Sequence, residues 1–322
     1  MRPYGTPCLP PWWARGGQAQ TLAGHFLRTP SRLAWEGVRL DLGDGDALAL
    51  RCAEGASDLV LYLFHGLGGS ADSAYIRRAA ARFHARGATV VAANHRGAGE
   101  GRGLARRPYH MGSTSDVAAV LAWGRARWPG KCHVAVGFSL SANVLLLLLG
   151  RDAEAALALP DGAVLVNPPG DTERASRRLV KGFNRVYDLR FLRLLVKLLK
   201  EQAAAGLGEG PPPLPRLATL RDFDEAYTAR AAGFRDAADY YAHSSSAPYL
   251  ASVGLPMVLI SAEDDPFAPA SDFEGRACSP HVHLHVERTG GHCGYVARNV
   301  PGRHWLDGAL DHYVAELRGC AG

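Results

Sequence analysis

The chain has 322 residues, of which 47% are hydrophobic and 21% charged, the balance of an ordinary globular protein. Its 36 basic and 31 acidic residues give a net charge of +5, and without a dense Lys/Arg block this argues against nucleic acid as a partner. Six scattered cysteines without a Cys-x-x-Cys pair predict neither a disulfide framework nor a zinc site.

The N-terminal segment does not have the pattern of a targeting sequence. Prolines and tryptophans interrupt residues 1–17, where a secretory signal needs a continuous apolar core. The chain nowhere approaches the roughly 18 uncharged apolar residues that a membrane span requires. Together with the scattered cysteines, these features lead us to expect a cytoplasmic protein.

Apolar runs and helical patterns alternate through the first half of the chain, and strands resume after a helix-rich insertion. Strands are predicted at 58–64, 88–94, 132–138, 162–169, 256–265 and 281–287, and helices at 70–87, 113–128, 141–150 and 303–318. From 171 to 250 the sequence is helix-rich and basic, with a Gly/Pro loop at 206–215. Continuous apolar strands separated by helices indicate a mostly parallel sheet covered on both faces. We therefore predict an α/β core of residues 1–170 and 251–322 with a helical cap insertion at 171–250.

The stretch GFSLS at 137–141 lies between a predicted strand and a predicted helix, which is the setting of a nucleophile elbow. The tight turn needs small flanking residues. Gly137 meets this need before Ser139, whereas Ser141 stands where a second glycine is usual. We predict Ser139 as a nucleophile, and the competing interpretation is a buried serine at a strand end.

Candidates for the base and for the acid that orients it follow in the order Ser, Asp, His that this fold requires. Asp264 and Asp265 end a predicted strand, and Asp265 is favoured because it begins a D-x-x-x-P loop of the kind that commonly carries the acid. His292, on a glycine-flanked loop after the last strand, is predicted as the base. Its neighbour Cys293 lacks an elbow and is interpreted as a packed thiol.

Acyl transfer also needs donors for the negative oxygen that develops on the carbonyl. We expect one N–H from Leu140, directly after the serine, and a second from Leu67 in HGLGG (65–69), where glycines let the backbone approach a substrate. This chemistry requires neither a cofactor nor a metal.

Two further patterns have simpler explanations than a ligand site. His281, His283 and His285 share one face of a predicted strand, and an exposed polar face explains them without a metal. The loop HRGAGEGRG at 95–103 lacks both the Gly-Lys-Ser/Thr ending of a phosphate loop and a G-x-G-x-x-G entry into a helix. We expect neither metal nor nucleotide binding.

Residues 189–200, LRFLRLLVKLLK, predict an amphipathic helix in the insertion. Its narrow basic face consists of Arg190, Arg193, Lys197 and Lys200. The simpler interpretation is a cap helix with a solvated basic stripe, and the alternative is contact with an anionic membrane surface. Either way the apolar face would line the site and favour an acyl ester as substrate.

Several motifs together resemble the YheT-like branch of the α/β-hydrolase superfamily. They are PWWARGGQAQTL (11–22), FHGLGGSADSAYIR (64–77), NHRGAGE (94–100), YHMGSTSD (109–116), GFSLSANVLL (137–146), KGFNRVYD (181–188), TLRDFDEAYTARAAGF (219–234), AEDDPFAP (262–269) and RTGGHCGYV (288–296). This resemblance covers nearly the whole chain. It implies an α/β-hydrolase fold and an ester hydrolase acting on carboxylic esters, acylglycerols or phospholipids, whose triad falls on Ser139, Asp265 and His292.

The chain departs from the pattern of that branch at three places. Ser141 and Ala142 replace a Gly-Gly pair, a leucine replaces a lysine in the following helix, and His95 replaces an aromatic residue. The resemblance favours a serine esterase that acts on a small-molecule or lipid ester. An acyltransferase or thioesterase with the same triad remains an alternative, as does a lipid-binding regulatory protein, although the intact triad disfavours the latter.

Overall fold

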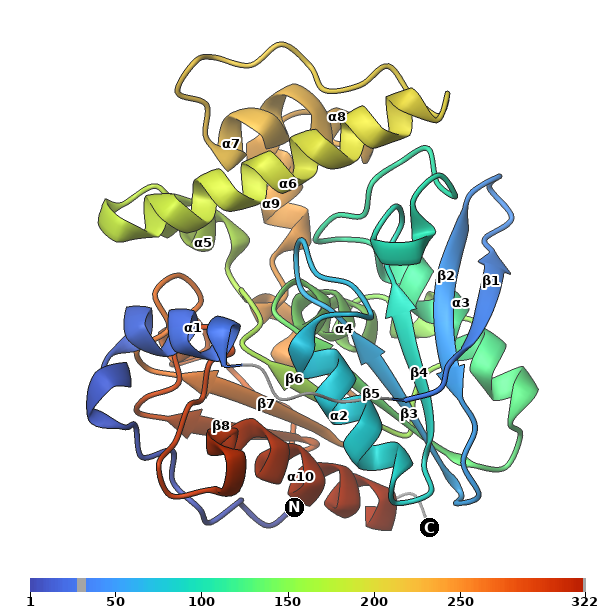
Figure 1. Cartoon of the computed structure of the whole chain (residues 1–322), viewed down its shortest axis with the longest axis vertical. Helices are drawn as coiled ribbons and strands as arrows, with labels where there is room; N and C mark the ends of the chain where they lie inside the picture. Colours follow the sequence, from blue (N-terminus) through green and yellow to red (C-terminus); the bar gives the residue numbers. More distant parts are fainter. Residues whose placement is uncertain (28–32, 321–322) are drawn as a thin grey trace.

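The computed structural model describes residues 1–27 and 33–320. Within them, one eight-stranded sheet has the order β1-β2-β4-β3-β5-β6-β7-β8 (Figure 1). Its strands are β1 (Glu36–Asp41), β2 (Ala47–Ala53), β3 (Leu59–Phe64), β4 (Thr89–Asn94), β5 (Cys132–Phe138), β6 (Gly162–Val166), β7 (Met257–Ala262) and β8 (Val282–Glu287). The pairs β1–β2 and β2–β4 are antiparallel, and the remaining pairs are parallel.

Different helices cover the two faces of the sheet. On one face pack α2 (Ala74–His84) and α10 (Trp305–Cys320), and on the other α3 (Thr114–Arg127) and α4 (Leu140–Gly150). The alternation of side chains along a strand serves both faces: in β3, Leu61 and Leu63 join the first cluster and Tyr62 and Phe64 the second. A mostly parallel sheet with helices on both faces confirms the predicted fold class.

The five helices of the insertion lie above the carboxyl ends of the parallel strands, with α6 running across them (Figure 1). They are α5 (Thr172–Leu179), α6 (Arg185–Ala204), α7 (Leu220–Phe223), α8 (Ala229–Ala231) and α9 (Ala237–Ser244), with a π-helical turn, η5 (Asp224–Thr228), between α7 and α8. Leu192, Leu195 and Leu199 of α6 pack in a cluster with Phe223 and with Phe267 of the core. The division of the chain into domains stays a prediction, and residues 28–32 and 321–322 of the predicted core lie outside the described residues.

Short elements complete the chain. An additional helix, α1 (Gly17–Phe26), precedes the sheet. The 3₁₀ turns are η1 (Trp12–Ala14), η2 (Gly99–Gly101), η3 (Ala153–Ala155), η4 (Gly182–Asn184), η6 (Ala247–Ser252), η7 (Ala270–Asp272) and η8 (Pro301–Arg303). None of the helices in the described ranges is long and apolar enough to cross a membrane.

The prediction of an exposed histidine face on the last strand is wrong at His285, although His281 is exposed and His283 partly exposed. His285 of β8 is buried, and its Nδ1 lies 2.6 Å from the hydroxyl oxygen of Tyr313 on α10. Leu284 and Val286, on the opposite face of this edge strand, are exposed instead. The reason is tertiary, because α10 covers the histidine face. Among the described residues no group of three or more His, Cys, Asp or Glu side chains could hold a metal ion.

Candidate active site

Ser139 lies on the turn between β5 and α4 with a φ of 52° and a ψ of −113°. A side chain in this region of backbone conformation is strained, at a cost on the order of 1–3 kcal/mol. Two hydrogen bonds hold the turn: the Ser139 N–H donates to the Val166 carbonyl at 2.8 Å, and the Asn143 N–H to the Ser139 carbonyl at 3.0 Å. Gly137 is required here, since a Cβ at that position would lie 2.7 Å from the Ser141 carbonyl oxygen.

The structure brings the three predicted triad residues together from three separate loops. The Oγ of Ser139 is 2.7 Å from Nε2 of His292, and Nδ1 of His292 is 2.7 Å from Oδ2 of Asp265. Thr21 of α1 accepts a hydrogen bond from the His292 backbone N–H at 2.9 Å. The Phe267 ring lies against the imidazole, with 4.0 Å between ring centroids. Ser139 stays partly exposed, so a substrate can reach its hydroxyl.

Asp265 is fully buried yet surrounded by donors. Its Oδ1 accepts the N–H groups of Phe267 and Ala268 at 3.0 and 2.9 Å, and its Oδ2 accepts Nδ2 of Asn167 at 2.7 Å. Burial alone would raise the pKa of Asp265, but the charge and hydrogen bond of His292, with the backbone donors, lower it overall. The carboxylate therefore remains ionised and can orient the imidazole.

Asp264 contacts the same histidine loop in a different way. Its Oδ1 accepts the backbone N–H groups of Gly290 and Gly291 at 2.9 and 2.8 Å. The pKa of Asp264 is raised overall, because the effect of burial is larger than the opposing effect of these two hydrogen bonds. Asp265 thus contacts the imidazole, and Asp264 holds the backbone just before it.

Asn167 is a contributor that the sequence reasoning missed. It follows β6 with a φ of 49°, and its side chain is buried. Its Nδ2 donates to Asp265 and also to the Gly291 carbonyl at 3.2 Å, so it joins the acid to the histidine loop. The available signal was an asparagine directly after a buried strand, because asparagine tolerates this left-handed conformation.

The predicted oxyanion donors belong to two segments next to Ser139: Leu140 follows it directly, and Leu67 lies in the 65–69 loop. A Cβ added to Gly66 would come within 3.2 Å of the Ser139 Cβ, which shows how closely the 65–69 loop approaches Ser139. Tyr75 accepts the Gly66 N–H at 3.0 Å, and Tyr109 accepts the Gly68 N–H at 2.8 Å. Within the described ranges, no acceptor is found for the N–H of Leu67, which lies between them, or for that of Leu140.

The cap holds the loop that carries the acid. Arg178 forms an ion pair of 2.9 Å with buried Asp272, and Nδ2 of Asn184 donates to the Pro266 carbonyl at 2.8 Å. The Tyr187 ring packs on Phe267 with 5.6 Å between ring centroids. The residues flanking Asp265 are therefore attached to α5, η4 and α6.

Cys293 does not compete with Ser139 for the role of nucleophile. Its Sγ lies 4.0 Å from the Val166 carbonyl oxygen, and burial raises the pKa of its thiol well above the usual value. A thiol in this state is protonated near neutral pH and weakly reactive. This agrees with its interpretation as a packed residue.

This sheet, with a serine on the turn between a central strand and its helix, defines an α/β hydrolase. The family model described as "alpha/beta hydrolase fold" matches residues 60–298, so the chain belongs to that family. It is 32% identical to "Putative esterase YheT" of Escherichia coli (strain K12), over 94% of this chain and 92% of that protein, which shows membership of the YheT-like branch.

More distant relatives and solved structures agree on the fold. The chain is 25% identical to "Phospholipase ABHD3" of Homo sapiens, over 96% of this chain and 78% of that protein. The Pyrococcus furiosus esterase Pf2001 superimposes with a TM-score of 0.57 at 17% identity, covering 90% of this chain and 98% of that one. The α/β hydrolase GrgF from Penicillium sp. sh18 has a TM-score of 0.57 at 16% identity, covering 90% and 99%. At these identities the two structures support the fold alone.

Proposed function

We propose that the chain is a serine esterase that cleaves carboxylic esters through an acyl-enzyme. The observation that carries this proposal is the unbroken hydrogen-bonded chain from Ser139 Oγ through His292 to Asp265. Nε2 of His292 takes the proton from Ser139 as Oγ attacks the ester carbonyl, and the N–H groups of Leu67 and Leu140 stabilise the oxyanion. The imidazolium then protonates the leaving alcohol. Water, activated by the same base, hydrolyses the acyl-enzyme.

The surroundings of the triad favour an acyl or lipid-like ester as the substrate. Leu22, Leu67 and Phe191 pack at the margin of the apolar cluster that joins the cap to Phe267. Apolar side chains of this kind stabilise an acyl chain by burial, at roughly 0.8 kcal/mol per CH₂. The names of the relatives, an esterase and a phospholipase, point in the same direction.

The ester hydrolase is tested by labelling and turnover. Wild-type protein should react with a fluorophosphonate and hydrolyse p-nitrophenyl esters, with rates that rise from acetate to octanoate. Ser139→Ala should lose both labelling and turnover, while its melting temperature stays close to that of wild type. Labelling that persists in Ser139→Ala, or turnover that does not depend on Ser139, would refute the assignment.

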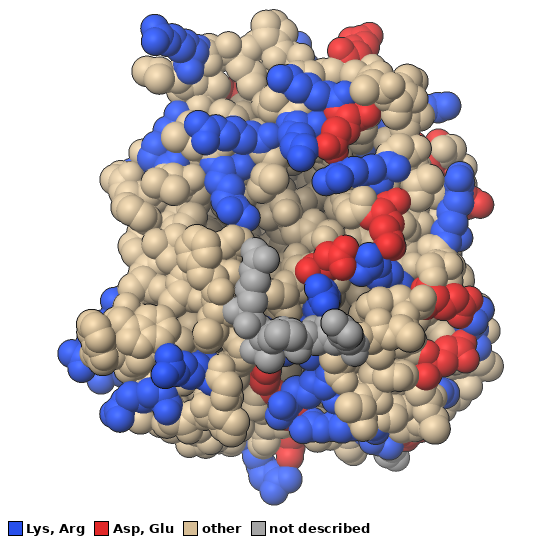
Figure 2. Space-filling model, in the orientation of Figure 1, with Lys and Arg blue, Asp and Glu red and all other residues tan. Residues whose placement is uncertain are grey.

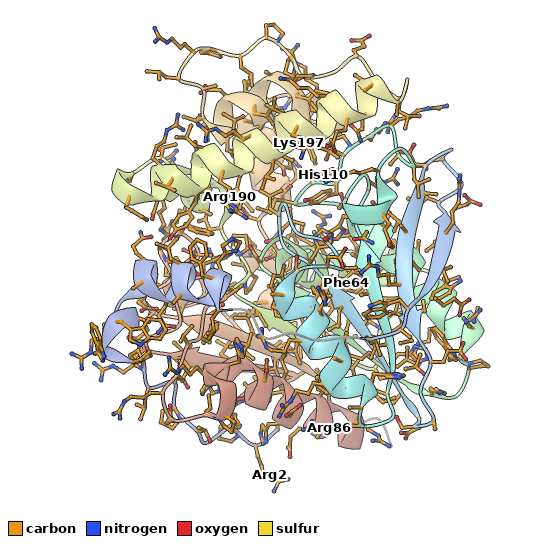
Figure 3. The ribbon with its side chains drawn as sticks, in the orientation of Figure 1. Arg2, Phe64, Arg86, His110, Arg190 and Lys197 are labelled. Atoms are coloured by element: carbon orange, nitrogen blue, oxygen red, sulfur yellow. The ribbon has the colours of Figure 1, made fainter. Side chains whose placement is uncertain are left out.

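We also propose that the outer face of the cap contacts an anionic lipid surface. Arg190, Arg193, Lys197 and Lys200 of α6 are all exposed, and Lys and Arg side chains gather along this helix (Figures 2 and 3). A groove of about 520 Å³ lies between α6 and the loop that precedes α7. Cationic Arg193, Lys197, Lys200 and Arg216 and apolar Leu189, Leu192, Val196, Leu214 and Pro215 are among its lining residues. Cations beside apolar side chains complement acidic headgroups and the acyl chains below them.

The cytoplasmic location stays a prediction.

Vesicle sedimentation tests this contact. Wild-type protein should sediment with phosphatidylglycerol/phosphatidylcholine vesicles and remain in solution with pure phosphatidylcholine. The double variant Arg193→Glu/Lys197→Glu should lose sedimentation. The matched control reverses two exposed arginines of the core, Arg39→Glu/Arg298→Glu, and should still bind. Equal loss in both variants would indicate an effect of net charge, and unchanged binding of the cap variant would exclude the proposed surface.

A further inference from the structure

The hydroxyl of Ser141, in the first turn of α4, is buried and hydrogen-bonded on two sides. It donates to the backbone carbonyl of His65, and Nε2 of His95 lies 2.6 Å from the Ser141 Oγ. The carbonyl can only accept, so it takes the single hydroxyl hydrogen. His95 must therefore donate to Ser141 through Nε2–H.

His65 has its proton on the other ring nitrogen. Its Nδ1 is 2.8 Å from the Gly66 carbonyl oxygen, so Nδ1 carries the hydrogen and Nε2 accepts the His95 backbone N–H at 3.3 Å. Burial keeps both imidazoles neutral: it lowers the pKa of His95 to about 4 and that of His65 well below its usual value. One arrangement of protons thus satisfies all these groups.

His95 also connects Ser141 to the other end of the 65–69 loop, through Tyr109. The His95 ring stacks on Tyr109, with 4.9 Å between centroids and 18° between ring planes. The Tyr109 hydroxyl accepts the Gly68 N–H at 2.8 Å. The His65 carbonyl is thus held by Ser141 and the Gly68 amide by Tyr109, and both of these residues contact His95.

We propose that Ser141 is a positioning residue that, with His95 and Tyr109, fixes the 65–68 loop so that the Leu67 N–H faces the oxyanion, a role that rests on the proposed ester hydrolysis. Without the hydroxyl, the His65 carbonyl and the His95 Nε2–H lose their partners in a buried place. The loop then moves to find others, because unpaired buried polar groups are costly. Loss of the Ser141 hydroxyl would therefore leave both the His65 carbonyl and His95 without this hydrogen bond.

The test removes this hydroxyl and a comparable buried one. Ser141→Ala is compared with Ser261→Ala, since Ser261 on β7 is also buried and its hydroxyl has no hydrogen-bond partner among the described residues. In Ser141→Ala, kcat for a p-nitrophenyl ester should fall about 10- to 100-fold with KM changed less than about twofold, because a misplaced donor weakens only the transition state. Affinity for a boronic acid, whose tetrahedral adduct mimics the oxyanion, should fall in parallel. Ser261→Ala should stay within about twofold of wild type in kcat.

A second variant and a second measurement separate this role from general destabilisation. His95→Phe keeps an aromatic ring beside Tyr109 but cannot donate to Ser141. Its loss of kcat should not add to that of Ser141→Ala in the double variant. Hydrogen exchange of the amides at 66–69 should quicken in Ser141→Ala and not in Ser261→Ala, whatever the enzyme hydrolyses.

The results distinguish the two proposals. If wild-type protein shows no turnover that depends on Ser139, ester hydrolysis is refuted. Hydrogen exchange at 66–69 still measures whether Ser141 holds the loop in place. Unchanged exchange at 66–69 in Ser141→Ala overturns the positioning role. If the wild type is active, an unchanged kcat, or a loss that falls on KM rather than kcat, overturns it as well.

Discussion

Exchanging each of the two adjacent aspartates for asparagine tests the geometry of the site most directly. In Asp265→Asn one side-chain oxygen becomes an NH₂ group. If NH₂ takes the place of Oδ2, it faces the NH₂ of Asn167 and requires His292 Nδ1 to be an acceptor. The imidazole then carries its proton on Nε2 and cannot accept one from Ser139. If the amide is flipped, NH₂ meets the backbone N–H donors that Oδ1 accepts.

In one orientation of the amide His292 cannot act as the base, and in the other the backbone N–H groups of Phe267 and Ala268 lose their acceptor. The same exchange in other triads lowers kcat by about 10⁴, or about 5 kcal/mol in the barrier, and we expect a loss of that order here. Asp264→Asn is the matched control. Its carbonyl oxygen can keep both glycine N–H groups, and its NH₂ takes the place of an oxygen without a partner among the described residues. We expect kcat within about tenfold of wild type.

The assay measures kcat for a p-nitrophenyl ester in both variants, with melting temperatures to show that each is folded. Asp264→Asn losing as much activity as Asp265→Asn would contradict the assignment of the acid. So would an Asp265→Asn protein that keeps more than about a tenth of the wild-type kcat, since its imidazole would then have the correct tautomer without the carboxylate.

Three further exchanges probe other parts of the molecule. Gly66→Ala places a Cβ within 3.2 Å of the Ser139 Cβ and should lower both kcat and the fluorophosphonate labelling rate about 10- to 100-fold. A labelling rate equal to that of wild type would contradict the close approach of the loop to Ser139. Asn167→Ala removes a donor to Asp265, which raises the pKa of that carboxyl, so the acidic limb of the kcat–pH profile should move to higher pH rather than stay in place. Burial raises the pKa of Asp224 from 3.8 to about 6, so the stability from its neutral form is present below about pH 4 and lost as pH rises through 6. Asp224→Asn stays neutral, so above pH 7 its free energy of unfolding should exceed that of wild type by on the order of 3 kcal/mol, as measured by urea denaturation. A difference between the two proteins that does not change with pH would refute this.

The core of the fold could be predicted because its elements are local patterns. The strand at 132–138 was predicted with its observed bounds, and the other five predicted strands were found with ends that differ by at most a few residues. β1 and β2 were missed, although the glycines at 43 and 45, between the alternating residues 36–41 and the mostly apolar residues 47–53, were a usable hairpin signal. The covering of β8 by α10 could not be foreseen, because it depends on where a distant helix packs.

Some parts of the candidate site could likewise be predicted from the sequence, and others could not. The positions of Ser139, Asp265 and His292 followed from chain order and strand ends, which the sequence carries. The partners of Ser141 did not, because His65 and His95 are 76 and 46 residues away from it. Periodicity describes which face of an element is apolar but not which buried polar atoms will meet. The sequence showed only that Ser141 stands where a second glycine is usual, whereas the structure shows that its hydroxyl is hydrogen-bonded on two sides.

The attachment of the cap to the loop of Asp265 bears on when the proposed triad is assembled. Asn184 holds the Pro266 carbonyl, and Arg178 pairs with Asp272 further along the same segment. A movement that lifted α5 and η4 from the core would pull on this segment and carry the carboxylate of Asp265 away from His292. Opening at that end would therefore disable the proposed nucleophile, Ser139, and closure over a substrate would restore it. Capture of the substrate and assembly of the catalytic machinery would then be one event.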